Sequence, residues 1–248
     1  MNQLPALAHY WRKDPIFHYS PIADRISGDR FLAIWRFLHF ADNTTQPDRS
    51  DPEYDRLFKV RPVISAVNRA CQQNYHGSQH QSIDEAMVAF KGRCSMKQYM
   101  PKKPIKRGFK IWVRADSSNG YVCQLQCYTG KEGNTTEVGL GGNVVTTLTQ
   151  ELVGKNYSIY MDNFFSSIHL YRRLLEDNIY ATGTLRSNRK MFPPDLVTVA
   201  KRGLVSRGAL DFRQADNVVV TVWQDTRPVV VLSTQHDPSN VGTVSRNQ

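Results

Sequence analysis

The chain has 248 residues, of which 40% are hydrophobic and 22% charged, and its formal net charge at pH 7 is +10. These proportions are typical of a folded globular protein and exclude an intrinsically disordered one. The excess of Lys and Arg predicts a polyanionic partner, although a basic surface without a partner remains an alternative. No apolar run approaches the roughly 20 residues of a membrane-spanning helix, and the first residues do not have the pattern of a secretory signal, so we expect no membrane association.

The first third of the chain is expected to be helical. Ser27–Phe40 combines a capping serine with apolar residues at helical spacing, which predicts an amphipathic helix whose apolar stripe faces a core. That stripe consists of Phe31, Ile34, Trp35 and Leu38. A loop rich in Asp, Pro, Ser and Thr follows at Asp42–Asp55. A second helix is expected at Leu57–Tyr75, with Pro62 in its first turn.

From Ser82 onward the pattern changes to short strands separated by helices. The expected strands are Ile83–Phe90, Phe109–Ala115, Tyr121–Tyr128, Ser158–Met161 and Tyr180–Leu185. Helices are expected at Val144–Leu152 and Ile168–Glu176. The glycine-rich Gly139–Asn143 does not have the spacing of a phosphate-binding loop and is expected to be a flexible turn.

After Arg186 the sequence predicts strands again. They are Leu210–Arg213, Val218–Gln224 and Val229–Thr234. The last two would form a hairpin across Asp225–Pro228.

Two aspartates stand where predicted strands meet loops: Asp84 in SIDEAMVAFKGR and Asp162 in YSIYMDNFFSS. Carboxylates on neighbouring strand ends can share a hard divalent cation such as Mg²⁺ or Mn²⁺. Taken alone, each aspartate is more easily explained as a turn residue or a helix N-cap than as a metal ligand. Of the four cysteines, Cys123 and Cys127 are the closest in sequence and have no histidine near them, which favours reduced thiols over a zinc site.

Basic residues gather in two places. Lys91–Arg114 contains nine Lys or Arg and no Asp or Glu, with Tyr99, Phe109 and Trp112 interleaved as possible stacking faces. This pattern favours contact with DNA phosphates over a solvated loop. A second basic set follows the predicted strand Tyr180–Leu185. Binding of flanking DNA and ordinary loop charge explain this second set equally well. The residues predicted to bind DNA are Lys91, Arg93, Lys97, Lys102, Lys103, Lys106, Arg107, Lys110, Arg186, Arg189 and Lys190.

Several motifs, in order, resemble the piggyBac family of DDE transposases, which includes piggyBac-derived cellular proteins. The motifs are SIDEAMVAFKGR, KPIKRGFKIWVRADSSNGYVCQLQCYTG, YSIYMDNFFSS and IYATGTLRSNRK, and the resemblance runs from about Ile22 to Ser233. It implies an α/β fold with a ribonuclease H-like mixed sheet, a helical N-terminal region and a β-rich C-terminal insertion. The implied regions are 1–80 for dimerisation and DNA binding, 81–190 for the catalytic core and 191–248 for the β-rich insertion.

In that family the first two catalytic aspartates lie in the IDE and DNFF motifs, which match Asp84 and Asp162. The resemblance implies that both hold Mg²⁺ or Mn²⁺. The third lies in a GGVDxxD motif, which this sequence does not contain, and Asp225 is expected to be a hairpin-turn residue and not a substitute. The cysteine-rich zinc domain usual in the family is also not found. We therefore expect this polypeptide alone to be inactive or nearly so, which leaves its standing as an enzyme open.

The resemblance implies that a full-length form binds transposon ends as double-stranded DNA and cleaves and joins phosphodiesters at TTAA target sites. A homodimer and a location in the nucleus are further implications. The alternative is a non-catalytic DNA-binding or regulatory protein derived from a transposon. A truncated or decayed element with exposed apolar surface is a third possibility.

Overall fold

The computed structural model describes residues 4, 6–14, 16, 19–130 and 139–242. The chain forms two compact units, Met1–Ser65 and Ala66–Gln248, which are described separately. Among the described residues, no helix has the length and hydropathy required to span a bilayer.

The first unit is built from short helices: η1 (Leu7–Trp11), α1 (Ser20–Ala23), α2 (Gly28–Phe37) and η2 (Asn43–Thr45). The predicted cap of α2 is confirmed, because the Ser27 hydroxyl accepts a hydrogen bond from the Arg30 backbone N–H at 3.3 Å. The indole N–H of Trp11 donates to the Ile26 carbonyl at 2.7 Å, and its ring lies 5.2 Å from the ring of Phe31.

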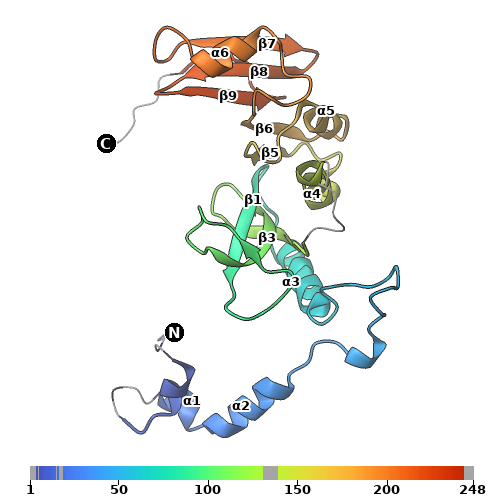
Figure 1. Cartoon of the computed structure of the whole chain (residues 1–248), viewed down its shortest axis with the longest axis vertical. Coiled ribbons are helices and arrows are strands. Elements are labelled where there is room, and N and C mark those ends of the chain that lie inside the picture. The colour runs from blue at the N-terminus through green and yellow to red at the C-terminus, as the bar shows by residue number, and fades with distance from the viewer. Residues whose placement is uncertain (1–3, 5, 15, 17–18, 131–138, 243–248) are drawn as a thin grey trace. The chain divides into compact units, whose positions relative to one another are not determined.

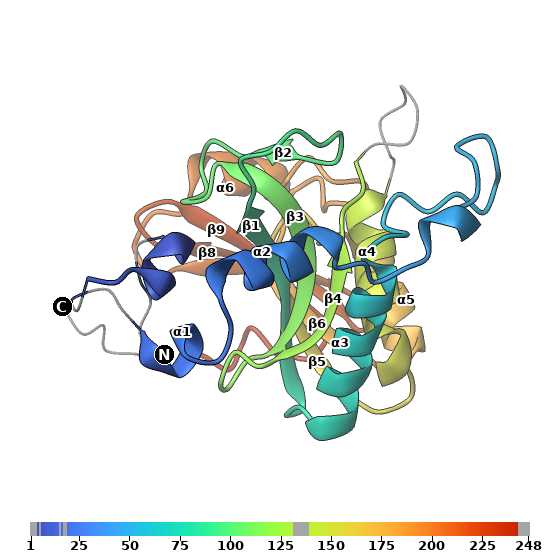
Figure 2. The same cartoon turned by 90° about the horizontal axis from the view of Figure 1, so that it is seen from below.

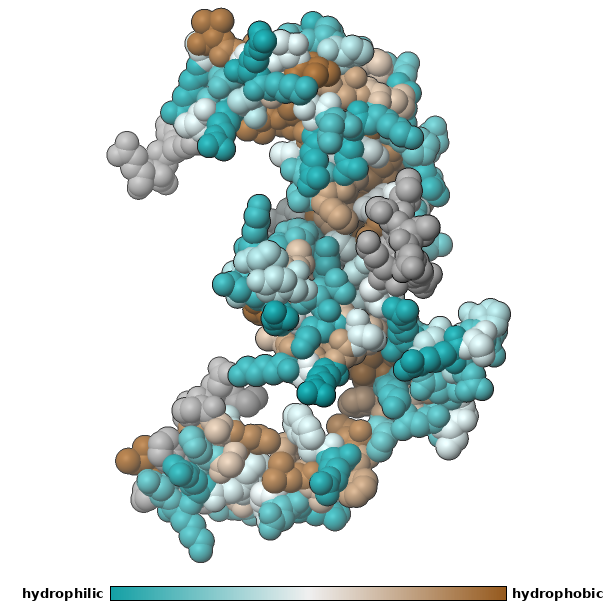
Figure 3. Space-filling model, in the orientation of Figure 1, coloured by the Kyte–Doolittle hydropathy of each residue, from teal (hydrophilic) through white to brown (hydrophobic). Residues whose placement is uncertain are grey.

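The expectation that the apolar stripe of α2 is core is wrong. Ile34, Trp35 and Leu38 are 47%, 65% and 55% exposed, and hydrophobic side chains form part of the surface over α2 (Figure 3). The physical reason is size, since the few short helices of this unit provide too little surface to cover both flanks of α2.

The helix α3 (Arg61–Asn74) begins later than predicted, and Pro62 lies in its first turn as expected. Within the second unit, its later part lies along β4 (Val122–Cys127) (Figure 2). The Asn68 amide fixes this contact, because its Nδ2 donates to the Leu125 carbonyl and its Oδ1 accepts from the Leu125 N–H, both at 2.9 Å.

The second unit is organised on one mixed sheet. Besides β4, its strands in the described residues are β1 (His80–Ala89), β2 (Gln98–Tyr99), β3 (Arg107–Asp116), β5 (Ser158–Met161), β6 (Tyr180–Thr184), β7 (Leu210–Ala215), β8 (Val218–Gln224) and β9 (Pro228–Ser233). Their order is β2-β3-β1-β5-β6-β9-β8-β7, with β4 paired to β3. The β1–β5 and β5–β6 pairs are parallel and the other pairs are antiparallel. The predicted mixed sheet is confirmed, and the β-rich segment extends the same sheet through the β6–β9 pairing.

Helices α4 (Leu140–Thr149) and α5 (Ile168–Glu176) lie side by side (Figures 1 and 2). Their apolar residues join the strands in one hydrophobic core that includes Leu148, Ile159 and Tyr171, each essentially unexposed. A short 3₁₀ turn, η3 (Gln150–Leu152), follows α4 directly.

Two features of the helices differ from the predictions. The glycine-rich segment is not a flexible turn: Gly139 has a left-handed φ of 82° and the next residues form the first turn of α4. A glycine is required at Gly141, because a Cβ there would lie 2.8 Å from the Phe164 carbonyl oxygen. The helix α6 (Leu196–Arg202), which lies over β8 and β9 (Figure 1), was not predicted.

Candidate functional site: two aspartates beside a basic surface

The parallel pairing of β1 with β5 places the two predicted aspartates next to each other. The register pairs Ile83 with Met161, so the next residues along the two neighbouring chains are Asp84, within β1, and Asp162, directly after β5. Both are exposed. The expectation that Asp84 stands where its strand meets a loop is wrong, because β1 begins at His80 and Asp84 therefore lies inside it. The strand continues past Asp84 to Ala89 through its pairing with β3, close to the predicted end at Phe90. The neighbouring strand β5 ends at Met161, so among the described residues β1 has no strand partner on that side beyond Ile83. Both carboxylates therefore lie at the C-terminal end of β5, where the sheet is open on one side of β1.

A tight turn holds Asp162 in place. Its Oδ1 accepts a hydrogen bond from the Phe164 N–H at 2.8 Å, and its backbone carbonyl accepts one from the Ser166 hydroxyl at 2.9 Å. Ser166 is completely buried, and its hydroxyl also lies 3.2 Å from that of Tyr171 on α5. Asp162 is therefore a turn aspartate as well as an exposed carboxylate, and the packing of α5 fixes its backbone.

A third carboxylate, not predicted from the sequence, lies beside the pair. Glu85 forms an ion pair with Lys103 at 3.0 Å between Oε1 and Nζ. Burial tends to raise the pKa of Glu85, but the Lys103 ammonium and a hydrogen bond with Asp84 outweigh it and lower that pKa. Although Asp84 is exposed as a residue, partial burial of its carboxyl group raises its pKa, and the neighbouring Glu85 adds to the effect. The only feature of the sequence that indicated a role for Glu85 was its position next to Asp84. Because side chains of adjacent residues normally point to opposite faces of a strand, this position did not predict that Glu85 lies beside the two aspartates.

An aromatic stack connects β3 to the turn of Asp162. The rings of Trp112 and Phe164 lie 5.4 Å apart at an interplanar angle of 20°. The Lys110 ammonium lies 3.7 Å from the Trp112 ring centroid and 4.9 Å from that of Phe164. Trp112 is 1% exposed, so its predicted role as a stacking face for nucleic acid bases is wrong.

The predicted basic segment Lys91–Arg114 connects β1 to β3 and continues through most of β3, and its members have different surroundings. The exposed residues are Lys91, Arg93, Lys102, Lys106 and Arg107. The Arg107 guanidinium lies over the ring of Tyr99 at 4.6 Å, whereas Lys97 donates to the Gly92 carbonyl at 2.7 Å. Arg114 is 1% exposed and bonds to Glu151 and Gln81, so it belongs to the interior and not to a DNA-facing surface.

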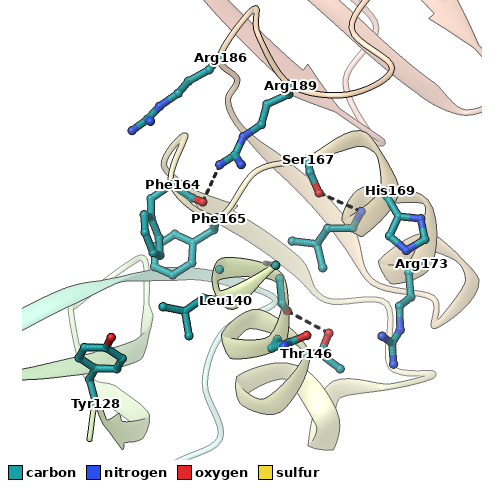
Figure 4. A pocket seen from close by; sticks show the side chains of 15 residues that line it. Tyr128, Leu140, Thr146, Phe164, Phe165, Ser167, His169, Arg173, Arg186 and Arg189 are labelled. Carbon is teal, nitrogen blue, oxygen red and sulfur yellow. Dashed lines mark hydrogen bonds between the residues drawn. The ribbon is translucent and has the colours of Figure 1, made fainter. Parts of the chain in front are cut away.

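Two residues of the second predicted basic set, Arg186 and Arg189, line a pocket of about 460 Å³ between the start of α4, the turn after β5 and the first turns of α5 (Figure 4). Arg186 donates from Nε to the Asn163 Oδ1 at 2.8 Å. Arg189 donates from Nη2 to the carbonyls of Asn163 at 2.9 Å and Phe164 at 2.8 Å. These two arginines therefore hold the turn of Asp162 while lining the pocket. Lys190 is exposed beside them.

His169 and Arg173 add two basic side chains to this pocket that the sequence analysis did not single out (Figure 4). They are four residues apart on α5, which places them on one face of the helix. Their helical spacing was visible in the sequence, but nothing in it indicated that this face borders the turn of Asp162.

The carboxylates have the donor chemistry that Mg²⁺ and Mn²⁺ prefer, since both ions favour oxygen ligands. Within the described residues there is no group of three or more His, Cys, Asp or Glu side chains placed to hold a metal ion. Mg²⁺ commonly binds through one or two carboxylates together with substrate phosphates and water. The Asp84 and Asp162 pair fits a site of this kind, in which two carboxylates hold the ion together with a phosphate and water.

The sheet identifies the class of fold. Three antiparallel strands, β4, β3 and β1, are continued by the parallel strands β5 and β6, with α4 and α5 between them in sequence. This is the ribonuclease H-like arrangement of DDE transposases.

The chain belongs to the transposase family described as Transposase IS4, whose family model matches residues 1–248. It is 33% identical to human PiggyBac transposable element-derived protein 3 over 93% of this chain and 39% of that protein. It is 30% identical to human PiggyBac transposable element-derived protein 2 over 92% of this chain and 39% of that protein. The cryo-EM structure of a piggyBac transposase synaptic complex with hairpin DNA matches 88% of this chain and 45% of that chain, with a TM-score of 0.76 and 30% identity. The predicted piggyBac resemblance is confirmed, and the chain spans less than half the length of these relatives.

Proposed function

We propose that this chain is the DNA-binding and metal-binding part of a piggyBac-like transposase, and that Asp84 and Asp162 hold Mg²⁺ or Mn²⁺ against a DNA phosphodiester. The observation that carries the proposal is the β1–β5 register, which makes the two aspartates neighbours at an open edge of the sheet. The solved relative is a transposase complex with hairpin DNA, which supports double-stranded DNA as the partner.

The surroundings of the carboxylates are suited to a phosphodiester. A bound divalent cation would polarise the phosphate and stabilise charge on the attacking and leaving oxygens. The chain supplies the remaining requirements. Exposed residues between β1 and β3, such as Lys102 and Lys106, provide cations for the DNA backbone. Arg186 and Arg189 hold the turn that carries Asp162, so that this carboxylate keeps its position when DNA binds.

Finer features of the proposal follow from the family. A full-length protein containing this region would cleave and join DNA at TTAA sites, as a dimer and in the nucleus. A polypeptide of these 248 residues has two aspartates in family motifs and no GGVDxxD segment. We expect it to bind DNA and to cleave it weakly or not at all, because fewer charged ligands lower metal affinity.

Fluorescence anisotropy with a labelled duplex tests the DNA-binding proposal. Binding should weaken steeply between about 50 and about 200 mM salt. The double variant Lys102→Glu/Lys106→Glu should bind at least about tenfold more weakly, because two phosphate contacts become repulsive. Lys155→Glu is the matched control, since Lys155 is exposed before the start of β5, at the opposite edge of the sheet from Asp162. Equal losses in both variants, or no binding by the unmodified protein, would refute the proposal.

A non-catalytic DNA-binding protein is the second candidate. The observation in its favour is that the described residues contain no three-residue metal-binding group. It predicts that Asp84→Asn and Asp162→Asn leave duplex affinity the same with and without Mg²⁺. Mg²⁺-dependent nicking of a duplex that Asp162→Asn abolishes would exclude this candidate.

A further inference from the structure

Lys110 differs from the other lysines of the basic segment in how it is held. It lies on β3, and its ammonium packs against the faces of Trp112 and Phe164 at 3.7 and 4.9 Å. Both rings are fixed, Trp112 by burial and Phe164 by its place in the turn of Asp162. A cation is attracted to the faces of aromatic rings, more strongly where it is shielded from water. Lys110 is therefore positioned by the fold, whereas exposed neighbours such as Lys106 are not.

Three carboxylates and one further ammonium act on Lys110, yet within the described part of the chain its own ammonium has no carboxylate partner. Burial lowers the pKa of Lys110 and the Lys103 ammonium lowers it further, while the carboxylates of Glu85, Asp162 and Asp84 act to raise it. These three groups are therefore close enough to act on it electrostatically. Glu85 is already paired with Lys103. Among the described residues, no carboxylate lies within hydrogen-bond or ion-pair distance of the Lys110 ammonium, so none of them takes the N–H donors that do not face the two rings.

An ammonium with free donors beside two exposed carboxylates matches the needs of a phosphodiester. The carboxylates repel a phosphate unless cations intervene, and a fixed ammonium neutralises part of that charge without having to be ordered on binding. Lys110 belongs to the same structural unit as the Asp162 turn, because Phe164 follows Asp162 by two residues and stacks on Trp112.

We propose that Lys110 contacts a non-bridging oxygen of the DNA phosphate that faces Asp84 and Asp162, and that its charge weakens the binding of a divalent cation until this phosphate is present. The proposal rests on the proposed function and extends it, because it assigns one substrate-contacting residue and an order of binding. DNA would bind first or together with the metal, since the phosphate removes the repulsion between the ammonium and the cation.

The test compares Lys110→Met, Lys110→Arg and the control Lys155→Met on the whole chain. Two quantities are measured: duplex binding across a salt series, and Mn²⁺ binding without DNA by electron paramagnetic resonance. Methionine keeps the aliphatic packing on Trp112 and removes the charge. In Lys110→Met we expect the slope of log affinity against log salt to fall by about 1, and Mn²⁺ to bind about three- to tenfold more tightly. Lys110→Arg should retain the salt slope. Lys155→Met should leave both the salt slope and the Mn²⁺ affinity unchanged.

The two measurements distinguish a failure of the Lys110 assignment from a failure of the proposed function. If the unmodified chain binds DNA but Lys110→Met leaves the salt slope unchanged, the assignment of Lys110 is overturned while the proposed function stands. A changed slope with unchanged Mn²⁺ affinity overturns the order of binding. If the unmodified chain binds no duplex, the proposed function fails and this inference with it. A thermal melt of Lys110→Met close to that of the unmodified chain shows that any loss does not come from unfolding.

Discussion

Arg189 was predicted to be a DNA-binding residue, but its contacts indicate that it stabilises the turn beside Asp162. Its Nη2 donates to the carbonyls of Asn163 and Phe164, at 2.9 and 2.8 Å. Replacement by alanine leaves both carbonyl oxygens without this donor. A hydrogen bond from a charged group contributes about 1.5–3 kcal/mol, and two acceptors that share one nitrogen gain less than twice that amount. Since Arg189 is half-buried, water replaces part of the loss.

We therefore expect Arg189→Ala to lower the free energy of unfolding by about 2 kcal/mol. For a unit of this size that corresponds to a melting temperature lower by about 4–8 °C. Urea unfolding followed by circular dichroism measures the change. Lys190→Ala is the matched control, because Lys190 is the exposed neighbour and should change stability by less than about 0.5 kcal/mol.

The reasoning is refuted if Arg189→Ala is as stable as Lys190→Ala. That result would mean that solvent satisfies the two carbonyls equally well, and that the contribution of Arg189 is to DNA affinity alone. A loss of stability in Arg189→Ala with a smaller loss in Arg189→Lys would support the assignment, because lysine restores one donor but not the planar geometry.

Three further predictions concern residues of the sheet that carries the site, and urea unfolding measures all three. Trp112→Ala should cost about 3–5 kcal/mol, because it empties a buried position between β3 and the Asp162 turn; a cost below about 1 kcal/mol would contradict the packing described. Gly183→Ala should cost about 1–3 kcal/mol or more, because a Cβ would lie 2.1 Å from the Met161 carbonyl oxygen; an unchanged stability would mean that β5 and β6 are further apart. Hydrogen bonds from Ser118 and Ser78 hold the pKa of Asp116 well below its usual range. The stability from Asp116 is therefore fully present above the unfolded pKa of about 3.9 and lost as pH falls below it. Asp116→Asn should flatten that dependence, and an identical pH profile in the variant would contradict the assignment.

The sequence predicted best those elements whose limits are set locally. The observed bounds of α5 (Ile168–Glu176) are those predicted, because Ser167 caps the helix by accepting from the Leu170 N–H at 3.2 Å. The strand β8 (Val218–Gln224) was equally predictable, being a run of β-branched residues that ends at a hairpin turn. The helix α6 was missed, because its β-branched Val and Thr residues favour a strand when considered alone.

The candidate site was predicted only in part. That Asp84 and Asp162 are neighbours was predictable as far as the motifs resembled a known family. The roles of Glu85, Lys103 and Lys110 were not, because they depend on the β1–β3 register, which pairs Glu85 with Trp112. That register joins strands separated by a basic connection of many residues, and no local pattern fixes it. The same limitation applies to Arg114, whose charge suggested a DNA contact and whose burial became evident only from its pairing with Glu151.

The most direct test of the central claim is the binding of Mn²⁺ in the presence of duplex DNA, measured by isothermal titration calorimetry for the unmodified chain, Asp84→Asn and Asp162→Asn. Asparagine keeps the shape of each side chain and removes its charge, so the two substitutions should preserve the fold. If the two carboxylates share a cation against a DNA phosphate, each substitution weakens Mn²⁺ binding by about tenfold or more. Equal Mn²⁺ affinity in all three proteins would show that the neighbouring aspartates do not form a metal site.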